Sequence, residues 1–240
     1  MARRAIWLLA IVTLLEGAAG VAVAQALPKH LQAAIEQVQH LSLENTSYNH
    51  GEGRVQWEGT RLSQTDCSGF LDALLIRSYG YSRDDFERWF DSHRPTAARY
   101  HDAIVAQKGF VAIPDIRAVR PGDILAVKYL HRKDNTGHVM LAVDAPRPMA
   151  AKKPVVEGTQ QWQVTVIDSS ESGHGPTDTR HAKGEDGKDH DGLGMGVLRV
   201  YADVQGRIAG FTWSPLQVSK FHGASDEPLV VGRLVPGFRP

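Results

Sequence analysis

The sequence contains a single cysteine among 240 residues, and this scarcity limits both the fold and the chemistry. One thiol cannot form an intramolecular disulfide, so the protein is not a small scaffold held together by disulfides. Its stability must therefore come from a buried apolar core. Cys67 is then either a small buried hydrophobic residue or a reactive group, and the surrounding sequence has to decide between the two.

The sequence also lacks an excess of charge of either sign. Lysine and arginine together number 27, and so do aspartate and glutamate. Removal of a leader that contains Arg3, Arg4 and Glu16 would leave a formal charge of about −1. This balance gives no electrostatic reason to expect a nucleic-acid partner. The chain has no internal repeats, and residues 27–240 are expected to form one domain, which we predict to be a monomer without a cofactor.

Long apolar runs of the kind that span membranes are missing as well. At the start of the chain two arginines precede an apolar stretch, residues 5–15, and small residues follow it. This order predicts a signal peptide over residues 1–26, cleaved after Ala24 or Ala26. The mature protein would be periplasmic or secreted, with no stable membrane insertion. An uncleaved anchor is the alternative, because the apolar character continues to Val23.

Helical patterns occupy the first part of the remaining chain. Apolar residues at helical spacing predict an N-terminal helix over residues 28–41, and an aperiodic loop leads from there to Asp66. A second helix is predicted from Asp66 to Gly80, because aspartate favours the N-cap and glycine the C-terminal end. Two more are predicted, one from a capping box at Ser82 and one over residues 96–108.

Strand patterns replace the helical ones after Ile116. Six β-rich runs follow, and turn residues separate them. These runs are 121–129, 137–144, 161–170, 196–204, 207–214 and 228–235. Helices followed by an antiparallel sheet are typical of the α+β class, which we predict for this protein.

Cys67 lies where a helix terminus would activate a thiol. Asp66 as the N-cap places Cys67 in the first turn, where the helix dipole and free N–H groups stabilise a thiolate and lower its pKa from about 8.5. The same N–H groups can stabilise an oxyanion on a substrate. Ser68 and Gly69 would leave room for the substrate to approach. A packed core cysteine is the alternative interpretation.

A reactive thiolate needs a base and a group that orients the base. His138 opens an apolar strand, and Asp168 ends the next one. If these strands pair, both side chains lie at the same end of the sheet, where Asp168 could hold the imidazole. A turn histidine and a strand-end aspartate are the alternatives.

Four segments in order resemble the NlpC-type cysteine peptidases, papain-like hydrolases of bacterial cell-wall peptides. The segments are "TDCSGFLDALL", "RPGDILAVKY", "TGHVMLAVD" and "VTVIDSS". The family pattern is a D-C-S-G helix start, a G-D strand, a G-H-V strand and a polar residue that ends the next strand. The resemblance covers residues 48–170.

The resemblance implies a papain-like NlpC-type fold in which helices pack on a central antiparallel sheet. It implies that Cys67 is the nucleophile, His138 the base and Asp168 the third member, a position often held by histidine. Tyr48 would assist the oxyanion hole, although the glycines of "SYNHGEG" are separated and the spacer to Cys67 is longer than in the family. The implied substrate is a peptidoglycan stem peptide, cleaved at an amide bond.

The polar loop over residues 171–194 is not covered by the resemblance. A loop of this length is usually functional or disordered, and we expect it to gate access to Cys67. Arg180 is predicted to bind a substrate carboxylate, together with Asp66 and Ser68 as further substrate contacts. Arg199 is considered for the same role, and a solvated side chain is the alternative for both arginines.

A metal site in this loop is the rival interpretation, since it is rich in histidine and carboxylates. The candidate ligands are His174, His181, His190, Asp178, Glu185, Asp186, Asp189 and Asp191. Their spacing fits no compact set of ligands, so we predict no metal.

Two other classes of function remain open from the sequence. The same triad could serve an amidase or acyltransferase that acts on an amide outside peptidoglycan. The chain could also be a binding module that captures muropeptides without turnover. The intact set of Cys67, His138 and Asp168 favours an enzyme.

Overall fold

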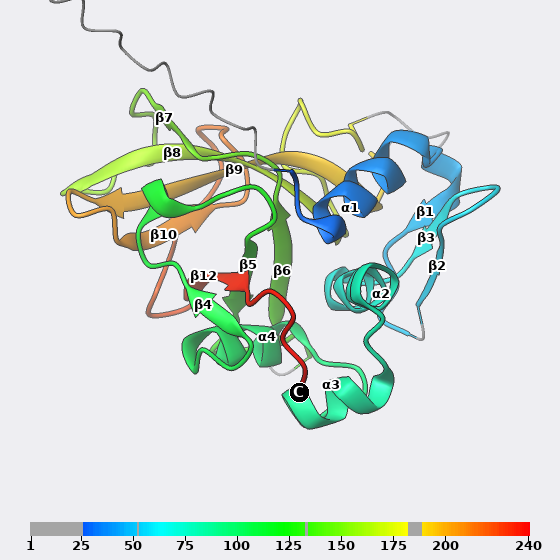
Figure 1. Cartoon of the computed structure of the whole chain (residues 1–240). Coiled ribbons are helices and arrows are strands. Elements are labelled where there is room, and N and C mark those ends of the chain that lie inside the picture. Colours follow the sequence, from blue (N-terminus) through cyan, green and yellow to red (C-terminus); the bar gives the residue numbers. More distant parts are fainter. Residues whose placement is uncertain (1–25, 52, 133, 182–188) are drawn as a thin grey trace, which may run out of the picture.

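The structure is a computed structural model that describes residues 26–51, 53–132, 134–181 and 189–240. Nearly all of the predicted signal peptide, residues 1–25, lies outside these ranges. Within them, no helix is long and apolar enough to cross a membrane. Helices pack against a large antiparallel sheet, as the α+β prediction expects (Figure 1).

The helices are α1 (Lys29–His40), α2 (Cys67–Tyr79), α3 (Arg83–Phe90) and α4 (Ala97–Val105), with 3-10 turns at Leu43–Asn45 and Ile116–Ala118. Two of the helices, α2 and α3, have the caps that their sequences predict. Gly80 ends α2 in the left-handed conformation, with φ of 69°. Ser82 and Asp85 form the predicted capping box of α3, in which each side chain accepts a hydrogen bond from the other residue's backbone. Local sequence therefore sets where these two helices begin or end.

The strands fall into two sheets. The small sheet has the order β1-β3-β2 and comprises β1 (Thr46–Ser47), β2 (Arg54–Gln56) and β3 (Leu62–Gln64). The large sheet has the order β11-β10-β9-β8-β6-β5-β12-β4, with β7 paired to β8. Its strands are β4 (Phe110–Ala112), β5 (Ile124–Lys128), β6 (Gly137–Ala142), β7 (Arg147–Met149), β8 (Thr159–Ser170), β9 (Gly192–Asp203), β10 (Ile208–Thr212), β11 (His222–Gly223) and β12 (Leu229–Leu234).

The small sheet differs from the sequence prediction, which assigned its segment to an aperiodic loop. Its strands have only two or three residues each, too few for an alternating pattern to show. β1 runs parallel to β3, and the Thr65 N–H continues this pairing with a bond to the Ser47 carbonyl. The segment before Cys67 is therefore fixed beside residues almost twenty positions earlier in the chain.

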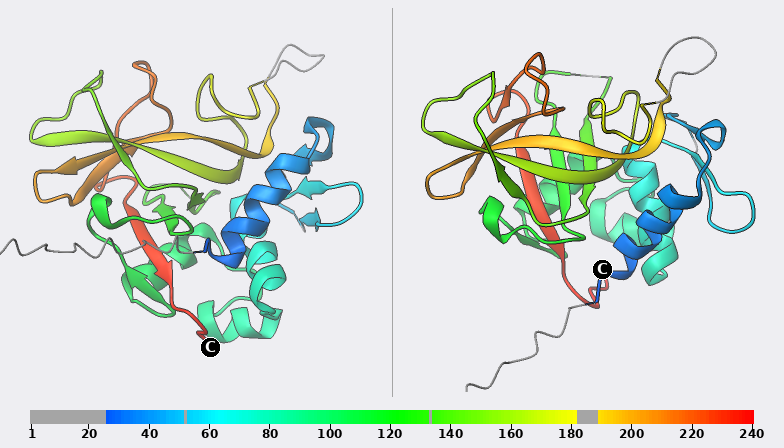
Figure 2. Two further views of the ribbon diagram at one scale, coloured as in Figure 1. Left: turned by 45° about the horizontal axis from the view of Figure 1, so that its top comes forward. Right: turned by 90° about the horizontal axis from the view of Figure 1, so that it is seen from above.

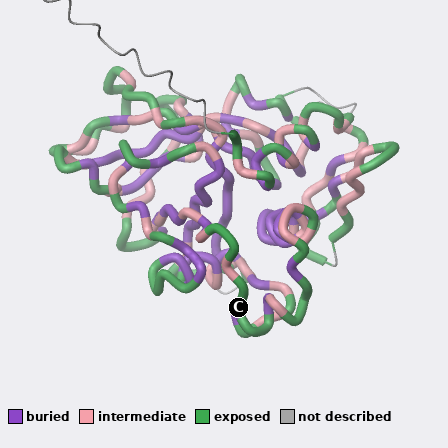
Figure 3. Tube along the Cα trace, viewed as in Figure 1, coloured by how far each residue is buried: buried purple, intermediate pink, exposed green. Residues whose placement is uncertain are grey.

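The centre of the large sheet is buried on both faces. Ile124 and Ala126 of β5 pack against the helices, whereas Leu125 and Val127 pack into a second apolar cluster on the other face. This alternation follows from the two-residue period of a strand. β5 and β6 are accordingly buried along nearly their whole length (Figure 3).

The longest strands, β8 and β9, form a ribbon that extends beyond the rest of the sheet (Figure 2). One end of this ribbon approaches α1 and the small sheet, and the other carries β7 and β10. β6 pairs with β8 through Leu141 and Ile167, in antiparallel orientation. The start of β6 and the last residues of β8 therefore lie at the same end of the sheet, beside the start of α2.

Candidate active site

Cys67 is the first residue of α2, as the sequence predicts. The Oδ1 atom of its N-cap, Asp66, accepts a hydrogen bond from the Gly69 N–H at 2.7 Å. The free thiol belongs to a residue that is 5% exposed and packs into the apolar core on the helix side of the sheet. The positive end of the helix dipole therefore lies at a thiol that is almost fully buried.

Asp66 and Ser68 hold the helix start, which revises their predicted role as substrate contacts. Asp66 Oδ1 also lies 3.3 Å from the Ser68 hydroxyl, and Oδ2 accepts from the Arg94 guanidinium at 3.0 Å. Both carboxylate oxygens are therefore engaged. A Cβ atom on Gly69 would lie 2.2 Å from the Thr65 hydroxyl, so this glycine is needed for packing.

His138 and Asp168 meet as predicted from the pairing of their strands. The Nε2 atom of His138 lies 2.5 Å from Oδ2 of Asp168, and both side chains are buried. Since a carboxylate can only accept, Nε2–H is the donor and Nδ1 remains for Cys67. The three predicted catalytic residues come together in this arrangement.

The electrostatics of His138 favour the imidazolium. Burial lowers the pKa of His138, but the charge of Cys67 and hydrogen bonds to Asp168 and Cys67 outweigh it and raise the pKa to about 10. A protonated histidine beside a thiolate is the resting state of an activated cysteine nucleophile.

This coupling can be measured directly. Replacing Cys67 with alanine removes a charge and a hydrogen bond, so we expect the pKa of His138 to fall below about 10. Histidine-detected NMR titration of the wild-type protein and the Cys67→Ala variant reports this shift. An unchanged pKa would mean that the thiolate does not stabilise the imidazolium.

Asp168 is held as an anion by three cationic or polar groups. Burial raises the pKa of Asp168, but His174, Arg180 and the hydrogen bond from His138 lower it well below the usual range. His174 Nε2 lies 2.9 Å from Oδ2, and Arg180 donates to Oδ1 at 3.0 Å. A buried carboxylate with this many donors keeps its charge and orientation.

His174 was missed as a functional residue, because the sequence suggested only a metal ligand there. Its Nδ1 lies 2.7 Å from the Trp213 carbonyl, and its Nε2 faces Asp168. Each ring nitrogen of His174 thus faces one acceptor. The indole of Trp213 lies edge-on to His138, with 5.3 Å between the ring centroids. His174 and Trp213 thus cover the side of the site where His138 and Asp168 meet.

Arg180 is fully buried behind Asp168, so the predicted contact with a substrate carboxylate is replaced by a supporting role. It binds Asp178 through two hydrogen bonds, of 2.8 and 2.7 Å, in addition to Asp168. Its Nη1 atom also donates to the Ser170 hydroxyl at 2.7 Å and to the Gly192 carbonyl at 2.9 Å.

Two glycines of β9 make room for this ionic cluster. A Cβ atom on Gly194 would lie 2.5 Å from the Arg180 guanidinium, and one on Gly196 would lie 2.2 Å from the Asp178 carboxylate. The G-L-G-M-G run therefore reflects close packing of buried charges against the strand. This was the sequence signal that could have indicated a buried cluster in the loop before β9.

Tyr48 is close enough to Cys67 for the thiol to affect its pKa, and its auxiliary role at an oxyanion hole stays a prediction. Burial raises the pKa of Tyr48, and the charges of Cys67 and Asp66 raise it further. The phenol therefore remains protonated and can donate a hydrogen bond. The pairing of β1 with β3 explains this position, because it fixes the residue after Ser47 beside the start of α2.

Comparison with known proteins places the chain in a family. No family model matches it, and no solved structure matches it. The uncharacterized protein R653 of Acanthamoeba polyphaga mimivirus is 38% identical over 202 residues, covering 79% of this chain and 88% of the viral protein. The chain belongs to the family of this viral protein.

A second tyrosine near Cys67, Tyr129, was not predicted from the sequence. Burial raises the pKa of Tyr129, as do the charges of Glu227, Cys67 and Asp168, while Arg132 lowers it. The guanidinium of Arg132 lies over the Tyr129 ring at 4.2 Å from its centroid. Tyr129 therefore remains protonated, and it follows β5 at the end of the sheet where Cys67 lies.

The first part of the polar loop, up to residue 181, supports the site, whereas the sequence predicted that the loop gates access to Cys67. His174, Asp178 and Arg180 are buried and hold Asp168 from behind, so residues 174–180 form part of the packed site. Residues 182–188 lie outside the described residues, and so do Glu185 and Asp186 of the considered metal site. Among the described residues, no group of three or more potential ligands is arranged to hold a metal.

Proposed function

We propose that the protein hydrolyses an amide bond through the thiol of Cys67. The observation that carries this proposal is the buried hydrogen bond from His138 to Asp168, together with the effect of Cys67 on the pKa of His138. A thiolate at a helix start, an imidazolium beside it and an orienting anion are the parts that acyl transfer requires.

In the first half of the reaction, the Cys67 sulfur attacks the carbonyl carbon of the amide. The thiol proton already resides on Nδ1 of His138, whose Nε2–H stays bonded to Asp168. The negative charge that forms on the carbonyl oxygen is stabilised by the Cys67 N–H and the Tyr48 hydroxyl. His138 then transfers its proton to the leaving nitrogen, so the C–N bond breaks and a thioester remains on Cys67.

In the second half, water hydrolyses the thioester. His138, now neutral at Nδ1, accepts a proton from the water as its oxygen attacks the carbonyl carbon. Collapse of the intermediate breaks the C–S bond, releases a carboxylic acid and restores the thiolate–imidazolium pair. Asp168 keeps its charge throughout and orients the ring.

The proposed substrate is a peptide of the bacterial cell wall, cleaved in the periplasm or outside the cell. This proposal is supported by the resemblance of the D-C-S-G, G-D and G-H-V segments to NlpC-type peptidases, together with the signal-peptide pattern. We accordingly propose a papain-like fold of the NlpC type. The arrangement of α2 against β6 and β8, with the nucleophile on the helix and the base on the strand, supports it.

The test is to digest purified sacculi and identify the released fragments by mass spectrometry. The wild-type protein and the Cys67→Ala variant are compared under reducing conditions, after both are shown to be folded. We expect new amino and carboxyl termini within the stem peptides, and only with the wild-type protein.

Two other outcomes would redirect the proposal. If no Cys67-dependent fragment appears, but a panel of other amides is cleaved or acylated, the enzyme acts outside peptidoglycan. If muropeptides bind to both proteins and neither cleaves them, the protein is a binding module.

A further inference from the structure

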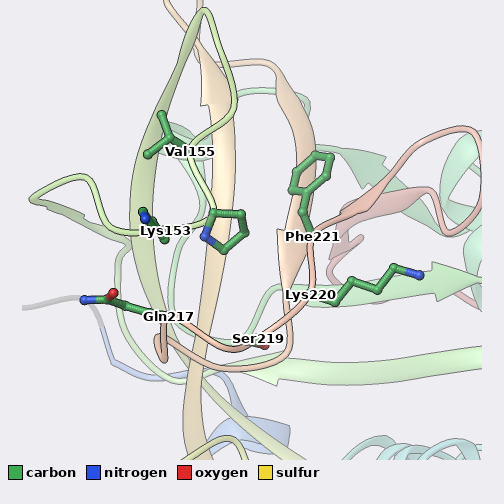
Figure 4. Close-up of a pocket in the computed structure, with 7 residues that line it drawn as sticks. Lys153, Val155, Gln217, Ser219, Lys220 and Phe221 are labelled. Atoms are coloured by element: carbon green, nitrogen blue, oxygen red, sulfur yellow. The ribbon is translucent and has the colours of Figure 1, made fainter.

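A pocket of about 560 Å³ lies between two loops at the other end of the β8–β9 ribbon. One loop connects β7 to β8, and the other follows β10 (Figure 4). Its lining residues are Lys153, Pro154, Val155, Gln217, Ser219, Lys220 and Phe221. None of these residues takes part in the site around Cys67.

A fully buried arginine fixes the two loops beneath this pocket. Arg199 of β9 donates to the Lys153 carbonyl at 2.9 Å and to the Leu216 carbonyl at 3.1 Å. Gln161 and Tyr201 add hydrogen bonds to the Pro154 carbonyl, at 3.2 and 2.7 Å. The backbone of both loops is thus tied to the sheet, so the pocket is part of the fold. Arg199 is therefore a supporting residue and cannot meet a substrate of Cys67.

The lining of the pocket contains two lysines and no acidic residue. Within the described parts of the chain, the Arg199 guanidinium donates to backbone carbonyls and the Thr212 hydroxyl and forms no ion pair, and burial lowers its pKa. Lys153 and Lys220 also make no ion pair there, and the lining contains no aspartate or glutamate. Since buried charges in proteins are normally paired, an unneutralised arginine below two lysines makes this region attractive to an anion.

The walls of the pocket are apolar and partly open. Val155 is 67% exposed and so is available to a ligand. Figure 4 shows Val155 and Lys153 on one loop and Phe221 and Lys220 on the other, with the Lys220 side chain extending away from Lys153.

We propose that this pocket binds a small amphiphilic anion, with a carboxylate or phosphate head attracted by Lys153 and Lys220. The apolar body of the ligand lies between Val155 and Phe221. A pocket of this volume is of the size that small-molecule sites in proteins have. The lysines supply the charge and the apolar walls supply the buried area.

This site is separate from the proposed catalytic centre. Arg199 is five residues along β9 from Gly194, the register partner of Asp168, which corresponds to roughly 17 Å. The proposal therefore does not depend on the activity of Cys67. The Cys67→Ala variant is expected to bind the same ligand equally well.

NMR titration of the isotope-labelled protein tests the proposal with three probes. Octanoate combines both ligand features, octanol has the chain alone, and acetate has the carboxylate alone. We expect octanoate to bind with a Kd on the order of 1 mM and to shift the amides around Val155 and Phe221. Octanol and acetate should bind at least about tenfold more weakly. Octyl phosphate, titrated in parallel, distinguishes the two head groups.

The double variant Lys153→Met/Lys220→Met is expected to weaken octanoate binding by about tenfold. Lys152→Met is the matched control, because Lys152 is a neighbouring exposed lysine that does not line the pocket. Val155→Asp should abolish binding by placing a carboxylate on the wall. The proposal is overturned if octanoate does not bind, if octanol binds equally well, or if the double variant binds like Lys152→Met.

Discussion

Replacing Asp168 with asparagine is expected to lower kcat/KM by roughly 10³- to 10⁴-fold. The carboxylate accepts the Nε2–H of His138 and stabilises the imidazolium, so an amide at this position removes the charge that holds the protonated ring. It can also turn its NH₂ group toward the ring and favour the wrong tautomer. The kinetic measurement uses as its substrate a peptide whose amide bond is cleaved in the sacculus digestion.

The pH profile of the same variant separates catalysis from folding. The pKa of His138 is raised to about 10, so the imidazolium is present below this pH and is lost as the pH rises through it. We expect the alkaline limit of kcat/KM to lie near pH 10 in the wild-type protein. In Asp168→Asn this limit should move to lower pH, because the favourable charge is gone.

Asp178→Asn is the matched control for this experiment. Asp178 is the other carboxylate on Arg180, yet it makes no contact with His138. Both variants should lose stability, because each leaves buried donors without their anionic partner. The rate at which iodoacetamide alkylates Cys67 at pH 7 should fall with Asp168→Asn and change little with Asp178→Asn. Equal rates in the two variants would show that Asp168 acts only on stability.

The parts of the site that the sequence predicts are those with local signals. Asp66 and Gly80 mark the ends of α2 through capping, which depends on a few adjacent residues. His138 and Asp168 are bounded by apolar strands, and antiparallel pairing of neighbouring strands brings them to one edge. Local chemistry and strand period therefore suffice for the three central residues.

The remaining parts depend on contacts that leave no periodic pattern. The segment 171–181 has few apolar residues, so by composition it resembles a solvated loop. Its charges are nevertheless buried, because His174, Asp178 and Arg180 neutralise one another around Asp168. Charge complementarity between side chains is a three-dimensional property, and only the closely spaced glycines of β9 indicate it in the sequence.

Removing the arginine of this cluster is expected to have the largest effect on stability. Arg180→Met would leave two carboxylates, Asp168 and Asp178, buried without their shared cation. The loss of one partner from a buried ionic group costs about 3–5 kcal/mol of unfolding free energy. Urea unfolding followed by circular dichroism measures this loss, provided that the m-value is unchanged.

The pH dependence of this loss identifies its cause. Arg180 lowers the pKa of both carboxylates, so their stabilising contribution is present above the unfolded value near 4 and is lost as the pH falls through the folded values. In Arg180→Met the carboxylates can take up protons, and the difference from wild type should therefore shrink as the pH is lowered from 7 toward 4. Arg199→Met is the matched control, because Arg199 is equally buried but bonds only to carbonyls and a threonine hydroxyl. Its stability loss should stay nearly constant over the same range, and a parallel pH dependence in both variants would contradict the ionic role of Arg180.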